Sequence, residues 1–353
     1  MESIISDSYA VHFNDTAFNE LNSILQLRQY STIFILVDEN IHTHCLAPFM
    51  GAIHGEYHFE IIEIESGEIN KTIETCVGVW EALSELGADR KSLLINLGGG
   101  VLTDLGGFVA STFKRGIHFI NVPTTLLSMV DASVGGKTGV DLGPLKNQVG
   151  VINQPVMVLI VTDFLETLEE RQVTSGFAEM LKHGLIKDVT YWNRLKKVSG
   201  LAEMKNHILA SVHIKNEVVL EDPTEQNLRK ILNYGHTLGH AIESYCLEHK
   251  TKSLLLHGEA IAIGMILEGY LSHRLTGLPK QSLNDIKTTF LTYFEKVSFS
   301  EEDITNILNL LKYDKKNSHG NINFVLLKTI GKTEIDVRVP DNLFRDAFAY
   351  YKE

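Results

Sequence analysis

Two histidines four residues apart, His236 and His240, stand in the segment NYGHTLGHAIE and share one face if that segment is helical. Side chains placed in this way can bind one metal ion together. The zinc-protease pattern H-E-x-x-H does not apply, because Thr237 occupies the position at which that mechanism needs a glutamate base. The spacing therefore allows a metal site and excludes the protease mechanism.

Two more segments supply side chains that bind metals. Glu179 and Lys182 are three residues apart in GFAEMLKHG, and His257 begins an apolar helical pattern in LLHGEA. A catalytic zinc ion takes three protein ligands, and one glutamate with two histidines is an accepted set. Any one of these histidines could instead be a packed core residue. Spacing leaves open which of four candidates bind metal: Glu179, His236, His240 and His257.

Lysines and arginines lie beside glycine, asparagine and apolar residues in several motifs. A role as solvated surface charges explains these neighbours poorly. The whole chain carries a formal net charge of −12. Cations gathered in an acidic protein predict an anionic substrate drawn into a positively charged cleft. For Arg229, in the polar segment DPTEQNLRK, a surface position is the alternative. The cations of this set are Lys137, Lys146, Lys182, Lys215, Arg229, Lys315 and Lys316.

A glycine triplet, Gly98 to Gly100, joins the strand pattern SLLINL to a helical pattern. Glycine lets the backbone approach a pyrophosphate, whose charge is favoured at a helix N-terminus. Thr103 stands where a full G-x-G-x-x-G has its third glycine, so a simple strand–helix turn is the alternative. Asp38 in VDEN and Thr124–Thr125 in VPTTLL end two other strands, where parallel sheets bind ligands. Together these segments predict a dinucleotide site.

Two styles of sequence meet near residue 170. Before it, apolar runs typical of buried strands alternate with helical patterns such as 70–89, which predicts a parallel sheet with crossover helices. The predicted strands are 31–39, 92–99, 117–123 and 156–163. After it the pattern is helical, except that 322–328 predicts a strand or hairpin arm. We expect an α/β domain over 1–170 and an all-α domain over 171–353, with the active site between them.

Composition excludes several classes of protein. The acidic net charge argues against nucleic-acid binding, and no apolar run reaches the roughly 18–20 residues of a membrane span. The first residues, MESIISDSYAVHF, lack the basic and apolar regions of a signal peptide. The widely spaced Cys45, Cys76 and Cys246 fit buried thiols rather than disulfides. We expect a cytoplasmic protein without nucleic-acid or membrane partners.

These segments, in this order, resemble 3-dehydroquinate synthase of the shikimate pathway over about residues 31–331. The resemblance implies an N-terminal Rossmann-like domain that binds NAD, a helical C-terminal domain, and a homodimer. It also implies a divalent metal, zinc or cobalt. The motifs that carry it are GGGVLTDLGGFVAS, FINVPTTLLSMVDASVGGKTGV, LKNQVGVINQP, SGFAEMLKHGLI, LRKILNYGHTLGHAIE, LLHGEAIAIGM, and DKK followed by FVLLKTIG.

Matching motif positions imply a role for each candidate residue. The implied metal ligands are Glu179, His236 and His257, while His240 faces the substrate as a proton-transfer or hydrogen-bonding group. The implied substrate positions are Asp131, Lys137, Lys146, Asn147, Lys182, Lys215, Arg229, Asn233 and Lys316, with Arg115 lent across the dimer interface. The implied cofactor positions are Asp38, Asn40, Glu68, Lys71, Gly98, Gly99, Gly100, Val101, Asp104, Thr124 and Thr125, together with Asp131, Lys137 and Lys146.

The resemblance implies a carbon–oxygen lyase that converts 3-deoxy-D-arabino-heptulosonate 7-phosphate to 3-dehydroquinate and phosphate. The metal would bind adjacent hydroxyls and lower the pKa of the one being oxidised. NAD would take hydride from C5, phosphate would leave, and the same NADH would return the hydride. Ring opening and an intramolecular aldol step would then close the carbocycle. The cations would hold the substrate's carboxylate and phosphate.

Two other classes of enzyme share this scaffold. Related sugar phosphate cyclases act on substrates without the carboxylate and differ at its binding positions, whereas Asn147, Lys215, Arg229 and Asn233 are all present here. Metal-dependent polyol dehydrogenases perform no elimination and lack the dense set of anion-binding lysines. The chain departs from many family members at Gln172, where glutamate is common, and in GPLKN, where GKN is commoner.

Overall fold

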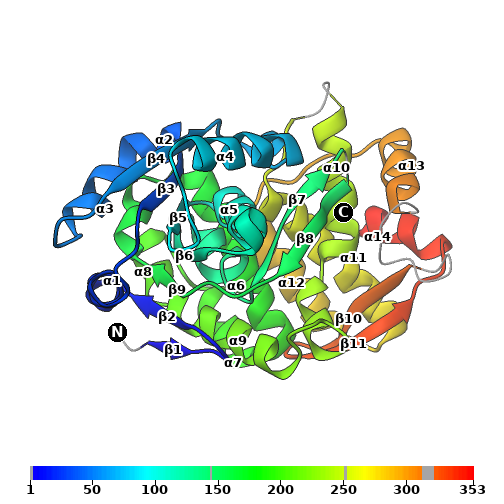
Figure 1. Ribbon diagram of the computed structural model, residues 1–353. Coiled ribbons are helices and arrows are strands. Elements are labelled where there is room, and N and C mark those ends of the chain that lie inside the picture. Colours follow the sequence, from blue (N-terminus) through cyan, green and yellow to red (C-terminus); the bar gives the residue numbers. More distant parts are fainter. Residues whose placement is uncertain (1–2, 144, 250–252, 312–321) are drawn as a thin grey trace. The chain divides into compact units, whose positions relative to one another are not determined.

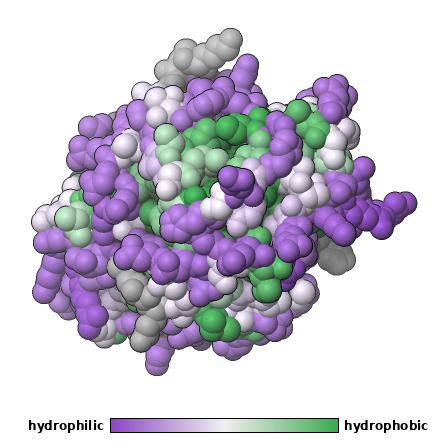
Figure 2. Space-filling view, turned by 60° about the vertical axis from the view of Figure 1, so that its left-hand side comes forward, coloured by the Kyte–Doolittle hydropathy of each residue, from purple (hydrophilic) through white to green (hydrophobic). Residues whose placement is uncertain are grey.

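The computed structural model describes residues 3–143, 145–249, 253–311 and 322–353. Contacts divide the chain into two compact units, unit 1 over residues 1–169 and unit 2 over residues 170–353. In Figure 1 unit 1 runs from blue to green and unit 2 from green to red. Hydrophilic residues cover most of the face that Figure 2 presents. Among the described helices, none combines the length and apolar character that a membrane crossing demands.

In the described part of unit 1, seven strands form a sheet in the order β1-β2-β9-β6-β5-β3-β4. Neighbours are parallel except for β1 and β2. The four predicted strands are confirmed as β3, β5, β6 and β9. The strand bounds are β1 Ile4–Ile5, β2 Ala10–Phe13, β3 Ile33–Asp38, β4 Phe59–Ile64, β5 Leu93–Gly98, β6 His118–Pro123 and β9 Met157–Ile160.

The central strands are buried on both faces, as their apolar runs predict. Every residue of β5 is buried, and so is every residue of β3 before Asp38. The predicted helix over 70–89 is shorter in the structure, because the Thr72 side chain accepts a hydrogen bond from Thr75 N and caps its start. The helices of unit 1 are α1 Asp15–Arg28, α2 Glu39–Ile41, α3 Ala47–Gly51, α4 Ile73–Glu85 and α5 Gly100–Thr112.

A hairpin of β7 (Lys137–Leu142) and β8 (Leu145–Ile152) packs against α5. The paired glycines of the LGGF segment allow α5 to lie close to its neighbours. A Cβ at Gly107 would come within 2.4 Å of Cγ2 of Thr138 on the hairpin, and one at Gly106 within 2.0 Å of Oδ1 of Asn96 on β5. Small residues therefore fix the distance of α5 from both the hairpin and the sheet.

In its described residues, unit 2 is helical with one hairpin. The strand predicted at 322–328 is present as β10 (Asn323–Thr329), and it pairs with β11 (Lys332–Arg338). The predicted helical domain is confirmed, and the strand expected within it has a partner because Gly331 at φ +86° allows a tight turn that returns the chain as a second strand. The helices are α6 Glu170–Lys187, α7 Val189–Leu195, α8 Leu201–Lys205, α9 Ile208–Glu221, α10 His236–Glu248, α11 His257–Leu275, α12 Lys280–Tyr293, α13 Glu301–Leu310 and α14 Asn342–Lys352.

The helix α11 forms the centre of unit 2 and packs against α6, α10, α12, α14 and β10 (Figure 1). Its residues from Ala260 to Gly269 are all buried, as expected for a helix that is apolar on all sides. The metal candidates lie on this helix and on two of its neighbours, α6 and α10.

Candidate functional site

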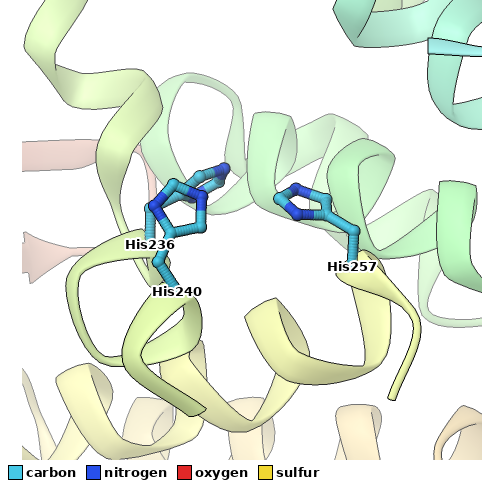
Figure 3. Close-up of side chains that lie close together, drawn as sticks. All are labelled: His236, His240 and His257. Carbon is cyan, nitrogen blue, oxygen red and sulfur yellow. The ribbon is translucent and has the colours of Figure 1, made fainter. Parts of the chain in front are cut away.

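Four side chains of unit 2 form a cluster at the start of two helices. His236 and His257 are the first residues of α10 and α11, His240 lies one turn along α10, and Glu179 is fully buried in α6. The three imidazole rings gather in one place (Figure 3), with centroids 5.1 to 5.7 Å apart. The structure thus brings together all four candidates that spacing left open.

Hydrogen bonds fix which ring nitrogens face the centre of the cluster. Nδ1 of His236 lies 3.1 Å from the carbonyl oxygen of Tyr234, and Nδ1 of His257 lies 3.2 Å from Oε2 of Glu243. A carbonyl oxygen only accepts, so Nδ1 of His236 carries the proton and Nε2 keeps its lone pair. Metal-binding histidines almost always donate their other N–H in this way.

The distances between the candidate ligand atoms fit a metal ion. Nε2 of His236 lies 3.5 Å from Oε1 of Glu179, and Nε2 of His257 lies 3.7 Å from the same oxygen. Zinc bonds nitrogen and oxygen at about 2.0–2.2 Å, so two ligands of one ion lie no more than about 4.3 Å apart. Both distances from Glu179 meet this limit, as a Glu-His₂ set requires. The nitrogens of His236, His240 and His257 also lie within 4.8 Å of one another, so a three-histidine set is the competing arrangement.

The cluster favours positive charge. Burial alone would lower the pKa of His257, but the carboxylates of Glu243 and Glu179 outweigh it and raise that pKa to about 10. The ammonium of Lys182, one helical turn along α6, contacts Oε2 of Glu179. Cations thus neutralise the buried carboxylate of Glu179, as its environment demands.

Glycine contacts set the positions of the three helices. A Cβ at Gly264 of α11 would lie 2.0 Å from the carbonyl oxygen of Gly235, and one at Gly239 of α10 would lie 2.7 Å from Cδ1 of Ile261. A Cβ at Gly258 would lie 1.9 Å from the carbonyl oxygen of Ser175 on α6. These contacts bring α10 and α6 against α11 at backbone distance, close enough for their side chains to share one ion.

The loop that leads into α10 carries the predicted anion-binding residues of unit 2. Arg229 is 2 % exposed and donates from Nη1 to the carbonyl oxygen of Pro223 at 2.7 Å, so the surface alternative for it is wrong. Nδ2 of Asn233 donates to Oε1 of Glu225 at 2.6 Å. Lys215 is buried on α9. Lys315 and Lys316 lie outside the described residues.

Sequence reasoning missed Asp222, which shapes this loop. Its carboxylate accepts hydrogen bonds from the backbone nitrogens of Gln226, Asn227 and Arg229 at 2.7 to 3.0 Å. Burial raises the pKa of Asp222, but these donors outweigh burial and lower it below the usual range. An aspartate before a proline is a common turn signal, which is the one hint that the sequence offered.

The predicted dinucleotide residues of unit 1 lie at the carboxyl ends of adjacent strands. Gly98 ends β5, Gly99 caps α5 and Gly100 begins it, with Val101 in the first turn. A Cβ at Gly98 would lie 2.0 Å from Cδ1 of Leu102, so glycine is required there. Thr124 follows β6 and donates from its backbone nitrogen to the carbonyl oxygen of Gly98 at 2.9 Å.

Two features of this edge fit a phosphate-bearing ligand. The first turn of α5 has no side-chain cap within the described chain, which leaves its N-terminus to bind an anion. The buried hydroxyl of Thr124 has no hydrogen-bond partner among the described residues. The neighbouring hydroxyl of Thr125 pairs with Ser128 at 2.9 Å. Residues of unit 1 therefore fit the pyrophosphate of a dinucleotide.

A second polar cluster, the Lys71 cluster, joins predicted cofactor and substrate residues. Nζ of Lys71 donates to Oδ2 of Asp104 at 2.6 Å and to Oδ1 of Asn147 at 2.7 Å. Nζ of Lys146 donates to Oε1 of Glu68 at 3.0 Å. The structure thus brings together five predicted residues from α5, β8 and the turn at 68–71.

Lys71 is a buried ammonium. Burial lowers its pKa, but the carboxylates of Asp104, Glu68 and Asp141 outweigh burial and raise it above the usual range. Asp141 was not predicted; its side chain accepts from the backbone nitrogen of Asn147 at 2.6 Å. The register of the β7–β8 hairpin sets that contact, and the sequence pattern gave no signal for it.

The remaining predicted residues of unit 1 lie on other segments. Asp38 ends β3 and accepts a hydrogen bond from Ile41 N at 2.8 Å, with Asn40 exposed in α2. Asp131 is partly buried in the turn at 128–132, and Lys137 is exposed at the start of β7. Arg115 is exposed beside a cavity of about 450 Å³ and has a left-handed φ of +69°.

Comparison with known proteins gives the family. Models of the 3-dehydroquinate synthase N-terminal and C-terminal domains match residues 61–175 and 176–317. A 3-dehydroquinate synthase of Parabacteroides distasonis is 41% identical over 339 residues, which cover 95% of each chain. The chain belongs to the 3-dehydroquinate synthase family.

Solved structures share the fold of this 3-dehydroquinate synthase family member. A 2-deoxy-scyllo-inosose synthase, solved with carbaglucose-6-phosphate, NAD⁺ and Co²⁺, superposes with a TM-score of 0.83 at 24% identity over 99% of each chain. A 2-epi-5-epi-valiolone synthase of Streptomyces hygroscopicus, solved with NAD⁺ and Zn²⁺, gives 0.81 at 25% identity over 100% of this chain and 99% of its own. Both share the architecture of this chain, a parallel α/β domain followed by a helical one.

Proposed function

We propose that this protein converts 3-deoxy-D-arabino-heptulosonate 7-phosphate to 3-dehydroquinate and phosphate, the activity of the family to which it belongs. The observation that carries the proposal is the cluster of Glu179, His236 and His257 in a chain whose family membership extends over nearly its whole length. A Glu-His₂ set leaves a coordination position open for substrate, as a catalytic site requires.

The two cofactors of the proposed reaction have matching residues. Glu179, His236 and His257 would hold a divalent ion such as zinc or cobalt, and the turn at Gly98–Gly100 with Thr124 would hold NAD. When bound, the ion would supply Lewis-acid polarisation of substrate hydroxyls, and NAD would supply reversible acceptance of a hydride. The oxidation and the reduction cancel, so the reaction yields no net NADH.

The chain's own residues bind and orient the substrate. Lys215, Arg229 and Asn233 of unit 2 would hold its carboxylate and phosphate through charge-assisted hydrogen bonds. Lys182 would add a point charge beside the metal ligands, and His240 would move a proton to or from a substrate hydroxyl. From unit 1, Asp131, Lys137, Lys146 and Asn147 would contact the substrate, as would Lys316 of unit 2. Because the reaction passes hydride between substrate and dinucleotide, turnover requires both units.

We propose further that the protein acts as a homodimer in the cytoplasm. The exposure of Arg115 supports a role for that residue toward the partner's site. The three cysteines are buried and form no disulfide with one another, as a reducing compartment favours. Sedimentation of the purified protein would give the oligomeric state. In a homodimer of this kind, Arg115→Ala lowers turnover while each chain keeps its own metal.

Reconstitution tests the proposed reaction. Protein loaded with NAD and zinc is mixed with the heptulosonate phosphate, and phosphate release, 3-dehydroquinate and NADH absorbance are followed together. We expect equal amounts of phosphate and dehydroquinate, without lasting NADH. Turnover only of a sugar phosphate without a carboxylate would instead identify another cyclase, and steady accumulation of NADH with a polyol would identify a dehydrogenase. The matched control variant is His240→Ala, which should keep the metal but lose turnover.

A further inference from the structure

A buried carboxylate of α11 lies behind the metal candidates. Glu268 is 0 % exposed, and its side chain reaches the N-terminus of α10. Oε2 accepts a hydrogen bond from the backbone nitrogen of Gly235 at 2.6 Å, and Oε1 accepts one from that of Leu238 at 3.1 Å. A negative charge at the N-terminus of a helix is favoured by the helix dipole and by the first N–H groups, which have no acceptor within the helix. Glu268 therefore caps α10 from a different helix.

The capped N–H belongs to the same peptide unit as the carbonyl that holds His236. Gly235 donates its N–H to Glu268, while the carbonyl oxygen of Tyr234, at the other side of that peptide bond, accepts from Nδ1 of His236 at 3.1 Å. A continuous path of hydrogen bonds thus runs from the carboxylate through one peptide to the imidazole. The other nitrogen of that imidazole, Nε2, is the one 3.5 Å from Oε1 of Glu179.

The Tyr234–Gly235 peptide, which lies between Glu268 and His236, is held in one orientation. Gly235 has φ +81°, and a Cβ there would lie 2.2 Å from Cγ of Met265, so the left-handed turn needs glycine. The hydroxyl of the fully buried Tyr234 donates to the carbonyl oxygen of Met265 at 2.9 Å. Both flanking residues are therefore anchored to α11, on the same turn as Glu268.

Such a path has an electrostatic consequence. A carboxylate that accepts the N–H of a peptide polarises it and makes its carbonyl oxygen a stronger acceptor, and hydrogen bonds in a chain strengthen one another. A stronger acceptor at Nδ1 raises the basicity of Nε2, which is the effect of the carboxylate that commonly supports a metal-binding histidine. His257 has such a carboxylate in direct contact, Glu243, at 3.2 Å.

We propose that Glu268 is a positioning residue for His236, acting through the Tyr234–Gly235 peptide as Glu243 acts directly on His257. The proposal rests on the metal site of the proposed function. Glu268 both orients the imidazole and increases the affinity of its Nε2 for a divalent ion. The two histidines of the site are then supported by one carboxylate each, one by contact and one through a peptide bond.

The test compares Glu268→Gln with Ser272→Ala. Glutamine keeps the shape and one acceptor but removes the charge. Ser272 is also fully buried on α11, and its hydroxyl contacts the backbone of Glu268 and Leu327 rather than the carboxylate. Zinc affinity of the NAD-free protein is measured by competition with a chromophoric chelator, and stability of the metal-free protein by thermal unfolding. We expect Glu268→Gln to weaken zinc binding by about 10- to 100-fold, as loss of a residue supporting a ligand does, and Ser272→Ala to leave it unchanged.

A spectrum separates this role from a loss of packing. In NMR spectra of zinc-loaded protein with ¹⁵N-labelled histidine, the chemical shift of the His236 Nδ1 proton should change in Glu268→Gln. The chemical shift of the His257 Nδ1 proton should stay the same. Zinc affinity equal to wild type in Glu268→Gln, or an equal loss in Ser272→Ala, would overturn the proposal. If Glu268→Gln does not fold, the wild-type spectrum decides, since a His236 Nδ1 proton without a hydrogen-bonded shift also overturns it. Wild-type protein that binds no zinc would refute the metal site itself, a different result.

Discussion

The division of labour between His236 and His240 is the sharpest prediction that the site allows. Both side chains leave the same face of α10, with ring centroids 5.1 Å apart. We expect His236→Ala to lose the metal, and His240→Ala to keep it while losing turnover. Glu179→Gln should behave like His236→Ala, because Glu179 completes the proposed ligand set. In the competing three-histidine set, Glu179→Gln would keep the metal.

The expected magnitudes follow from the geometry. Nε2 of His236 lies 3.5 Å from the carboxylate oxygen of Glu179, within the limit for two ligands of one ion. Loss of a residue that merely supports a ligand weakens metal binding by about 10- to 100-fold, so loss of the ligand itself should exceed about 100-fold. A proton-transfer group contributes about 10²- to 10⁴-fold to rate, which is the loss of kcat expected for His240→Ala.

Two assays decide the question. Metal content after gel filtration is measured by mass spectrometry, and zinc affinity by chelator competition, for each variant. The control is His249→Ala, which removes a histidine from the C-terminal end of the same helix. Equal metal loss in His236→Ala and His240→Ala would refute the division of labour, and retention of metal by Glu179→Gln would favour the three-histidine set.

Four further predictions concern stability, each measured by urea unfolding. Gly264→Ala should destabilise the protein by about 1–3 kcal/mol or more through overpacking, because its Cβ would lie 2.0 Å from a backbone oxygen. Gly269→Ala, whose Cβ has no neighbour closer than 3.4 Å, should instead stabilise α11 by about 0.5–1 kcal/mol. Lys71→Met should cost about 3–5 kcal/mol, since it leaves the carboxylate of Asp104 without its buried ammonium; no loss would show that the pair is well solvated. Because folding lowers the pKa of Asp222, its ionised carboxylate stabilises the fold at pH values above its pKa in the unfolded chain, about 4. This stabilisation is lost as the pH falls through the pKa of Asp222 in the folded protein. Asp222→Asn should therefore flatten the decline of stability between about pH 5 and pH 3, and a curve parallel to wild type would contradict this.

Strand and helix patterns were predictable because each depends on neighbours in the chain. The apolar runs at 31–39 and 92–99 mark strands buried on both faces, and they became β3 and β5. The hairpin arm at 322–328 was also visible as an apolar run among helices. The exact start of α4 was not, because it depends on one cap, the hydroxyl of Thr72 on Thr75 N.

The candidate site was predictable by residue type and less so by contact. Glu179, His236, His240 and His257 were all named from spacing, which cannot give distances between helices far apart in the chain. The supporting residues escaped notice for the same reason. Glu268 and Asp141 are acids in segments without a recognisable spacing, and only their hydrogen bonds to α10 and to Asn147 give them a role.

The sequence by itself determined the period of each element, the acidic charge, the glycine turn at 98–100 and the presence of a histidine pair one turn apart. These properties follow from local sterics and from the pattern of apolar residues. Tertiary structure alone decided which nitrogen of each histidine faces Glu179, because the opposite nitrogen is held by Tyr234 in one case and by Glu243 in the other. It also decided that α10 approaches α11 at backbone distance, which requires glycines from both helices to meet in space.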